Sequence, residues 1–186
     1  MHTATAHLSS IAPYSQSRYH DTPKLEKERA DDYERRTWRN RLHVSRTSGN
    51  VFIPPMAFKN CLSEAAKFLS MQVPGKGKAT FTKHFEAGVL VTEGPDLGVR
   101  PEDVEGERLF LNADGKRGSG TRVVRMMPVI HDWSARVAFH IVDETITEDV
   151  FNRHLQEAGS LIGIGRFRPR NNGYYGRFQV DRVDWS

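Results

Sequence analysis

The chain has 186 residues, of which 38% are hydrophobic and 27% are charged, and its net charge is +4 at neutral pH. This length suffices for a substantial core, and we expect a single domain over residues 1–186. No apolar run approaches the roughly 20 residues of a membrane-spanning helix, and the N-terminal residues MHTATAHLSS do not resemble a signal peptide. We therefore expect a soluble, cytoplasmic protein with no membrane partner.

The content of cysteine and histidine argues against several kinds of site. Cys61 is the only cysteine, which excludes an intrachain disulfide and a thiolate metal cluster, and its place on an apolar helix face favours a core residue over a reactive thiol. None of the eight histidines is spaced to put two metal ligands on one helical face.

The segment GKGKAT lacks Walker A spacing, and no GxSxG hydrolase motif is present. We predict no metal, no cofactor and no catalytic residue.

The first predicted element is a strand at residues 3–13, followed by a charged insertion or arm at 18–50. The inward-facing residues of the strand are expected to be Ala6, Leu8 and Ile11. Within the arm, residues 24–42 predict an exposed helix, because Asp31 and Asp32 stand four residues before Arg35 and Arg36. Acids before bases is also the order that the helix dipole favours. The basic residues therefore either stabilise this helix or contact phosphates; they are Arg35, Arg36, Arg39 and Arg41.

The next helix is expected to begin at Pro54 and Pro55, since proline suits the first turn of a helix. Its buried face is predicted to consist of Phe58, Cys61, Leu62, Ala65 and Leu69. The segment VPGKGKATFTKHFEAGVLV then predicts a basic loop that leads into a strand at about 88–91. The lysines of this loop either remain solvated or contact phosphates; they are Lys76, Lys78 and Lys83.

Residues 97–120 contain five glycines, mixed charges and one apolar piece at 109–111, which predicts a loop-rich excursion with a short strand. Two strands are expected after it, at 122–127 and 134–142, joined to each other as a hairpin.

A second amphipathic helix is predicted to begin after Thr147 as its N-cap and to end at Gly159. The last strand is expected at 175–184. Apart from the insertions, this order is close to the β-α-β-β-α-β plan. The predicted fold is therefore α+β: a ferredoxin-like or RRM-like antiparallel sheet with two helices on one face, a charged helical insertion after the first strand, and a glycine-rich segment before the last strand.

The glycine-rich segment, GSLIGIGRFRPRNNGYYGRF at residues 159–178, has five glycines, four arginines and four aromatic residues but no acid. Glycine lets a backbone approach a ligand, arginine binds phosphate, and aromatic rings stack on bases, so the composition suits a nucleic-acid strand. The alternative is a hairpin with solvated arginines and core-facing aromatic residues. GIGRFR follows a helix and has arginine in place of the third glycine, which argues against a dinucleotide fingerprint.

The predicted nucleic-acid contacts come from four regions. On the glycine-rich segment they are Arg166, Arg168, Arg170, Tyr174, Tyr175 and Arg177, with Lys76 and Lys78 on the basic loop, Lys59 at the helix start, and Arg18 and His20 as a second group. A histidine beside a tyrosine can also catalyse RNA cleavage without a metal ion. The nearest candidate for this role is His20, next to Tyr19. A polar binding loop without chemistry is the favoured interpretation of YSQSRYH.

The helix start in VFIPPMAFKNCLSEAAKFL and the glycine-rich segment before the last strand resemble the repeat-associated RNA-binding superfamily known as RAMP. The likeness is greatest to the backbone subunits that coat guide RNA in CRISPR effector complexes. It implies an RRM-like or ferredoxin-like core that binds single-stranded RNA or DNA through its backbone, often as a homo-oligomer within a ribonucleoprotein. This chain is shorter than most such subunits, which leaves less room for their thumb-like hairpin. It also resembles uncharacterised phage and prophage proteins, which implies a phage origin.

The leading hypothesis is a non-enzymatic protein that binds single-stranded nucleic acid mainly through phosphates. Such binding should depend steeply on salt and little on sequence. One alternative is a metal-independent RAMP-type endoribonuclease. Another is a phage-borne mimic of a CRISPR backbone subunit that acts through protein partners.

Overall fold

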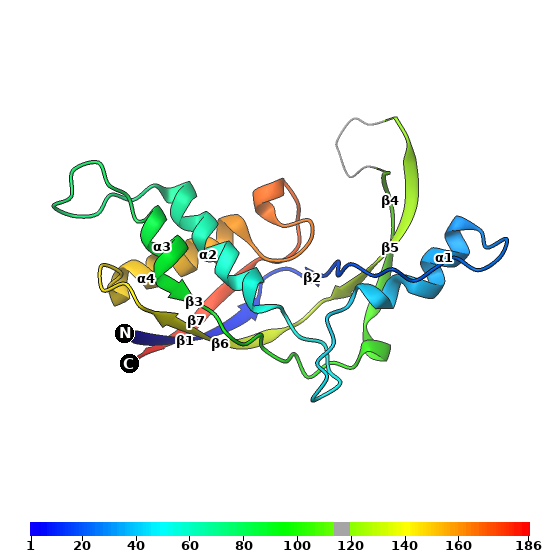
Figure 1. Cartoon of the computed structure of the whole chain (residues 1–186), viewed down its shortest axis with the longest axis horizontal. Helices are drawn as coiled ribbons and strands as arrows, with labels where there is room; N and C mark the ends of the chain where they lie inside the picture. Colours follow the sequence, from blue (N-terminus) through cyan, green and yellow to red (C-terminus); the bar gives the residue numbers. More distant parts are fainter. Residues whose placement is uncertain (114–119) are drawn as a thin grey trace.

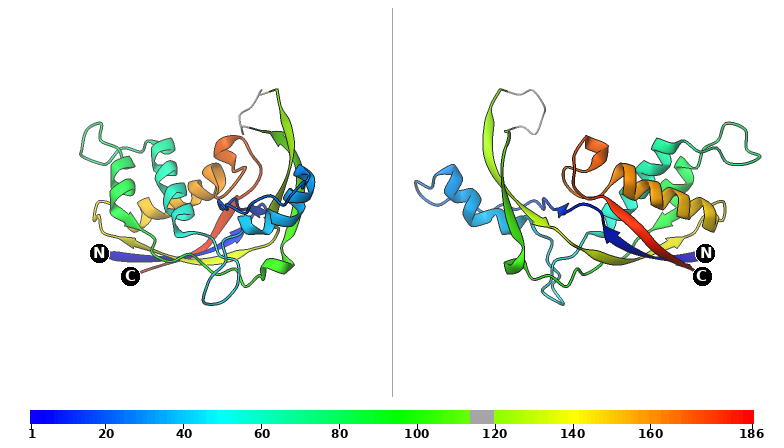
Figure 2. Two further views of the ribbon diagram at one scale, coloured as in Figure 1. Left: turned by 45° about the vertical axis from the view of Figure 1, so that its right-hand side comes forward. Right: turned by 180° about the vertical axis from the view of Figure 1, so that it is seen from behind.

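The structure is a computed structural model that describes residues 1–113 and 120–186. It has an α+β fold, as predicted, with a four-stranded antiparallel sheet covered on one face by helices and a separate three-stranded antiparallel sheet (Figures 1 and 2). The strands are β1 (His2–Ser10), β2 (Tyr14–Ser15), β3 (Val89–Leu90), β4 (Glu105–Asn112), β5 (Arg122–Ile130), β6 (Ser134–Ile141) and β7 (Phe178–Trp185). The α-helices are α1 (Ala30–Thr37), α2 (Pro55–Leu69), α3 (Thr82–Gly88) and α4 (Glu148–Glu157).

The larger sheet has the order β3-β6-β1-β7, with α2 and α4 in the two crossover connections, which is the ferredoxin-like arrangement. Because successive side chains of a strand alternate between faces, central strand β1 buries Ala4, Ala6 and Leu8 under the helices. The inward positions predicted for Ala6 and Leu8 are confirmed. That of Ile11 is wrong: β1 ends at Ser10, and the Ile11 side chain is 54% exposed.

Helix α2 begins at Pro55, as predicted, and its buried face includes Phe58, Cys61 and Leu62. The Cys61 thiol donates to the carbonyl of Ala158 at 3.3 Å, which confirms a core role for this cysteine. Helix α3 was not predicted. It has only seven residues, and the ring of Phe85 packs 4.3 Å from that of His154 on α4, so distant packing stabilises it.

The β4–β5 hairpin differs most from the prediction. Strand β4 has eight residues in place of the short piece expected at 109–111, and it pairs with β5 from Glu105 opposite Val129 to Asn112 opposite Arg122. The predicted hairpin of the strands at 122–127 and 134–142 is wrong, because β5 and β6 belong to different sheets. The short chain thus still accommodates a long hairpin, which projects beyond the larger sheet (Figure 1).

The charged arm is helical only over α1 and a following 3-10 turn, Trp38–Arg41. The expected pairs of Asp31 and Asp32 with Arg35 and Arg36 are not among the ion pairs of the described residues: Asp31 binds Arg108 of β4, and Arg36 binds Glu28, which precedes α1. Tertiary partners therefore override the local i, i+4 spacing.

Helix α4 begins after Thr147, but the Thr147 side chain makes no capping hydrogen bond. The helix does not end at Gly159 as expected, because a π-helical turn continues it over Ala158–Ile162. A Cβ on Gly159 would lie 2.2 Å from the carbonyl oxygen of Phe178, so glycine permits close packing on β7 instead of stopping the helix. Among the described residues, no helix is both long enough and apolar enough to cross a bilayer.

Candidate nucleic-acid interface

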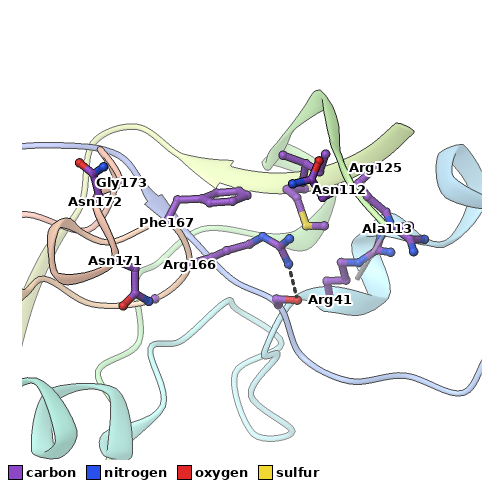
Figure 3. Close-up of a pocket in the computed structure, with 13 residues that line it drawn as sticks. Arg41, Asn112, Ala113, Arg125, Arg166, Phe167, Asn171, Asn172 and Gly173 are labelled. Atoms are coloured by element: carbon purple, nitrogen blue, oxygen red, sulfur yellow. Dashed lines mark hydrogen bonds between the residues drawn. The ribbon is translucent and has the colours of Figure 1, made fainter. Parts of the chain in front are cut away.

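A groove of about 730 Å³ lies where the glycine-rich segment passes the β4–β5 hairpin. Its lining includes three arginines that come from distant parts of the chain, so we call it the arginine groove: Arg41 follows α1, Arg125 is on β5, and Arg166 is on the glycine-rich segment. Figure 3 shows Arg166 reaching toward Arg41 and Arg125. Phe167 and the backbone around Gly173 complete the wall on the side of the glycine-rich segment.

Close backbone contacts hold Arg166 in place. Gly165 has φ +73°, and a Cβ there would lie 2.4 Å from the ring of Tyr14, so only glycine fits without strain. The Arg166 amide donates to the carbonyl of Ser15 at 2.9 Å, and its guanidinium donates to Ser17 Oγ at 3.1 Å (Figure 3). The guanidinium carbon also lies 4.6 Å from the ring centre of Phe167. Gly165 thus lets the backbone approach the N-terminal segment closely. The resulting contacts direct the Arg166 side chain into the groove.

Arg41 and Arg125 share one buried carboxylate, that of Glu34 on α1. Arg125 donates to it at 2.6 Å, Arg41 at 3.1 Å and the Met126 amide at 3.1 Å. Burial opposes ionisation of Glu34, but these three hydrogen bonds together outweigh it and lower the pKa of Glu34. The carboxylate is therefore ionised at neutral pH and orients both guanidinium groups.

The groove has more positive than negative charge. Three guanidinium groups line the groove, and among the described residues the only acid that pairs with any of them is Glu34, which binds Arg41 and Arg125. Among the same residues, the buried Nε of Arg166 has no hydrogen-bond partner. Burial lowers the pKa of Arg166, and repulsion from Arg41 and Arg125 adds to this effect. A guanidinium nevertheless stays charged at neutral pH, so an anion in the groove would relieve the repulsion among the three arginines.

The other predicted arginines of the glycine-rich segment are not in the groove. Arg168 donates to Glu64 of α2 at 2.7 Å, and the guanidinium of Arg170 lies 5.6 Å from the ring centre of Phe68 on the same helix. Arg177 donates to the backbone carbonyl of Ser160 at 3.3 Å. These three side chains fasten the segment to the helical layer or to itself.

The predicted contacts outside the glycine-rich segment are also dispersed. Lys59 donates to the carbonyls of Phe85 and Glu86 at the end of α3, at 2.8 and 2.9 Å. Lys76 and Lys78 are exposed on a loop at the opposite end of the molecule from the β4–β5 hairpin (Figures 1 and 2).

The second group of contacts lies closer to the groove. The amide of Arg18 donates to the carbonyl of Arg41 at 2.9 Å, which places Arg18 beside the groove. His20 Nδ1 lies 3.2 Å from Thr22 Oγ1, and its ring packs 6.4 Å from that of Tyr33. No group of histidine, cysteine or acidic residues in the described ranges is placed to hold a metal ion.

Tyr174 and Tyr175 line a different pocket, together with Glu105 and Glu107. The two tyrosines therefore do not line the arginine groove; Phe167 does, and its ring centre lies 6.1 Å from that of Tyr175. Arg125 was not predicted as a site residue, because it stands among apolar residues in VVRMM and nothing in its local sequence indicates binding. Arg41 did have such an indication in the sequence, since it belongs to the basic end of the charged arm.

No family model matches the chain, and no curated protein sequence is significantly similar to it. Solved structures do match. A chain of the type III-B Cmr-beta complex bound to cognate target RNA superposes with a TM-score of 0.55 at 10% identity, over 99% of this chain and 60% of that chain. The protein therefore has the same fold as this Cmr-beta chain.

Two further solved structures are similar at a lower TM-score. Cmr6 from Pyrococcus furiosus gives 0.48 at 14% identity and covers 96% of this chain and 98% of that chain. A chain of a CRISPR RNA-guided surveillance complex gives 0.39 at 12% identity, with coverages of 96% and 67%. The chain spans 60% of the length of the matched Cmr-beta chain, and at these identities the likeness concerns the fold alone.

Proposed function

We propose that this protein binds single-stranded RNA, without cleaving it, by holding phosphates in the arginine groove. The observation that carries the proposal is the convergence of Arg41, Arg125 and Arg166 on one groove, where Glu34 is the only acid among the described residues that pairs with any of them. Arginine forks onto phosphate oxygens, and a charge-assisted hydrogen bond is about twice as strong as a neutral one. The matched Cmr-beta complex is bound to target RNA, which favours RNA over DNA as the ligand.

The geometry suits recognition of the RNA backbone rather than of its bases. Two of the guanidinium groups are oriented by Glu34 and the third by Ser17, so their donors are preorganised before a ligand arrives. The ring of Phe167 lies at the edge of the same groove and offers a surface for one base. Contacts to phosphates carry no sequence information, so the affinity should vary little among unstructured RNAs.

Fluorescence anisotropy with a short labelled oligouridine tests the proposal at several salt concentrations. Arg166→Ala should weaken binding about tenfold, as expected for a charged hydrogen bond, and should lower the salt slope by roughly 0.7, the value of one phosphate contact in a single strand. Arg168→Ala is the matched control, because Arg168 lies on the same segment but is paired with Glu64. An equal loss in both variants, or an affinity that salt does not change, would refute the proposal.

Two parallel measurements address the alternatives. The matching oligodeoxyuridine should bind more weakly than the RNA. The RNA should also be recovered intact after long incubation; cleavage that His20→Ala abolishes would instead favour the endoribonuclease. The remaining residue assignments, oligomerisation along the strand, ribonucleoprotein partners, the mimic role and a phage origin stay predictions.

A further inference from the structure

A second pocket, of about 520 Å³, is lined by Tyr174 and Tyr175 of the glycine-rich segment and by residues of the β4–β5 hairpin. We call it the tyrosine pocket, and the residues that matter in it are Pro13, Glu105, Glu107, His131, Tyr174 and Tyr175. Its charge is opposite to that of the arginine groove. Among the residues that the structure describes, two carboxylates line it and no lysine or arginine does.

The strand register explains how one hairpin carries both charges. Glu107 lies opposite Met127, and residues two apart along a strand face the same side. The face that presents Arg125 and Met127 to the arginine groove therefore also presents Glu105 and Glu107, nearer the base of the hairpin. The glycine-rich segment crosses this face between the two sites, where the Tyr175 amide donates to the Phe167 carbonyl at 3.0 Å.

The tyrosines give the pocket aromatic walls. The Tyr175 hydroxyl donates to the Glu107 carboxylate, which fixes that ring against β4. Tyr174 packs edge to face on it, with ring centres 5.7 Å apart, and its own side chain is 63% exposed. His131 Nε2 lies 3.1 Å from the Glu105 carboxylate. A ligand in the pocket would therefore meet an accessible aromatic face and two acids.

We propose that the tyrosine pocket binds an arginine side chain presented by a basic segment of a partner protein. A guanidinium stacks on the face of a tyrosine and forks onto a carboxylate, so one group satisfies both features of the pocket. The two carboxylates repel phosphates, which assigns this pocket to a protein and the arginine groove to RNA. The proposal does not depend on RNA binding, because the two sites share no charged residue.

The test uses a fluorescein-labelled hexa-arginine peptide and the full-length protein in anisotropy titrations without RNA. The variant with both Glu105→Gln and Glu107→Gln should bind at least about tenfold more weakly, as expected from the loss of charged hydrogen bonds. Glu144→Gln, an exposed acid outside the pocket, is the matched control and should bind like the wild type. Tyr174→Leu should weaken binding roughly two- to fivefold, and Tyr174→Phe should restore it, since phenylalanine keeps the aromatic face.

Oligouridine titrations of the same variants show whether the tyrosine pocket acts independently of the arginine groove. If it does, the RNA affinity of each variant should stay within about twofold of the wild type. Equal peptide binding by the pocket variants and Glu144→Gln would overturn the proposal. A loss of RNA binding in Tyr174→Leu would also overturn the proposal, because it would show that Tyr174 contacts RNA instead of a protein partner. Self-association of the wild type that the two glutamine substitutions abolish would support the pocket and identify the partner as a second copy of this chain.

Discussion

Replacing Glu34 with glutamine is expected to weaken the fold and to strengthen RNA binding at the same time. The Glu34 side chain is 2% exposed and accepts hydrogen bonds from Arg41, Arg125 and the amide of Met126. Glutamine keeps the size of the side chain but removes the charge, which leaves two guanidinium groups without a counterion. Removing one partner of a buried ion pair costs about 3–5 kcal/mol.

The lower end of that range applies, because the Arg125 side chain is 38% exposed and is partly solvated already. A loss of about 3 kcal/mol in a chain of this length lowers Tm by roughly 6–12 °C. The same substitution leaves the positive charges of the arginine groove uncompensated, so RNA should bind more tightly and with a steeper salt dependence.

Circular dichroism melts and oligouridine titrations measure the two effects on the same samples. Glu28→Gln is the matched control, since Glu28 belongs to the same arm and binds Arg36 away from the groove. It should leave RNA affinity unchanged. A Glu34→Gln variant that loses both stability and RNA affinity would refute the reasoning, because the carboxylate would then be needed to orient the arginines more than it offsets their charge.

Three further predictions concern the same framework. Gly165→Ala should lower Tm and weaken oligouridine binding, because its Cβ would clash with the Tyr14 ring and displace Arg166; unchanged melts and titrations would contradict the assigned backbone constraint. Burial raises the pKa of the Cys61 thiol, so a thiol reagent such as Ellman's should react only on unfolding, and rapid reaction of the native protein would contradict its core position. The lowered pKa of Glu34 means that its contribution is complete above its unfolded pKa, about 4.3, and is lost as pH falls through the lower folded value. Urea titrations should therefore show the unfolding free energy falling below about pH 4, less steeply in Glu34→Gln than in the wild type.

The sequence was most informative where structure follows from local patterns. The start of α2 at Pro55 and most of its buried face follow from a proline and from apolar residues at helical spacing, and both were predicted; of the predicted face, only Leu69 is half-buried instead of buried. Strand β4 lacked such a signal. Its residues EGERLFLN are mostly exposed or half-buried on both faces, so apolar alternation is weak and only pairing with β5 defines the strand.

The residues of the candidate site likewise include some that the sequence could predict and some that only the structure identifies. Sequence composition alone singled out the glycine-rich segment as a place where arginines and close backbone approach coincide. It did not distinguish Arg166 from Arg168 and Arg170, which have the same local signal. The structure does, because Glu64 and Phe68 of α2 engage Arg168 and Arg170, while Arg166 meets Arg41 and Arg125.

Sequence by itself thus predicted an α+β fold close to the β-α-β-β-α-β plan and the chemical groups that the protein has to offer, since both depend on residue type and short-range spacing. Tertiary structure decided which charges stay available. An arginine is neutralised or left facing a groove according to the partners that folding brings to it, and those partners lie far away in the chain: Glu64 is 104 residues from Arg168. The same long-range packing placed Tyr175 against Glu107, apart from the arginines that precede it in the sequence.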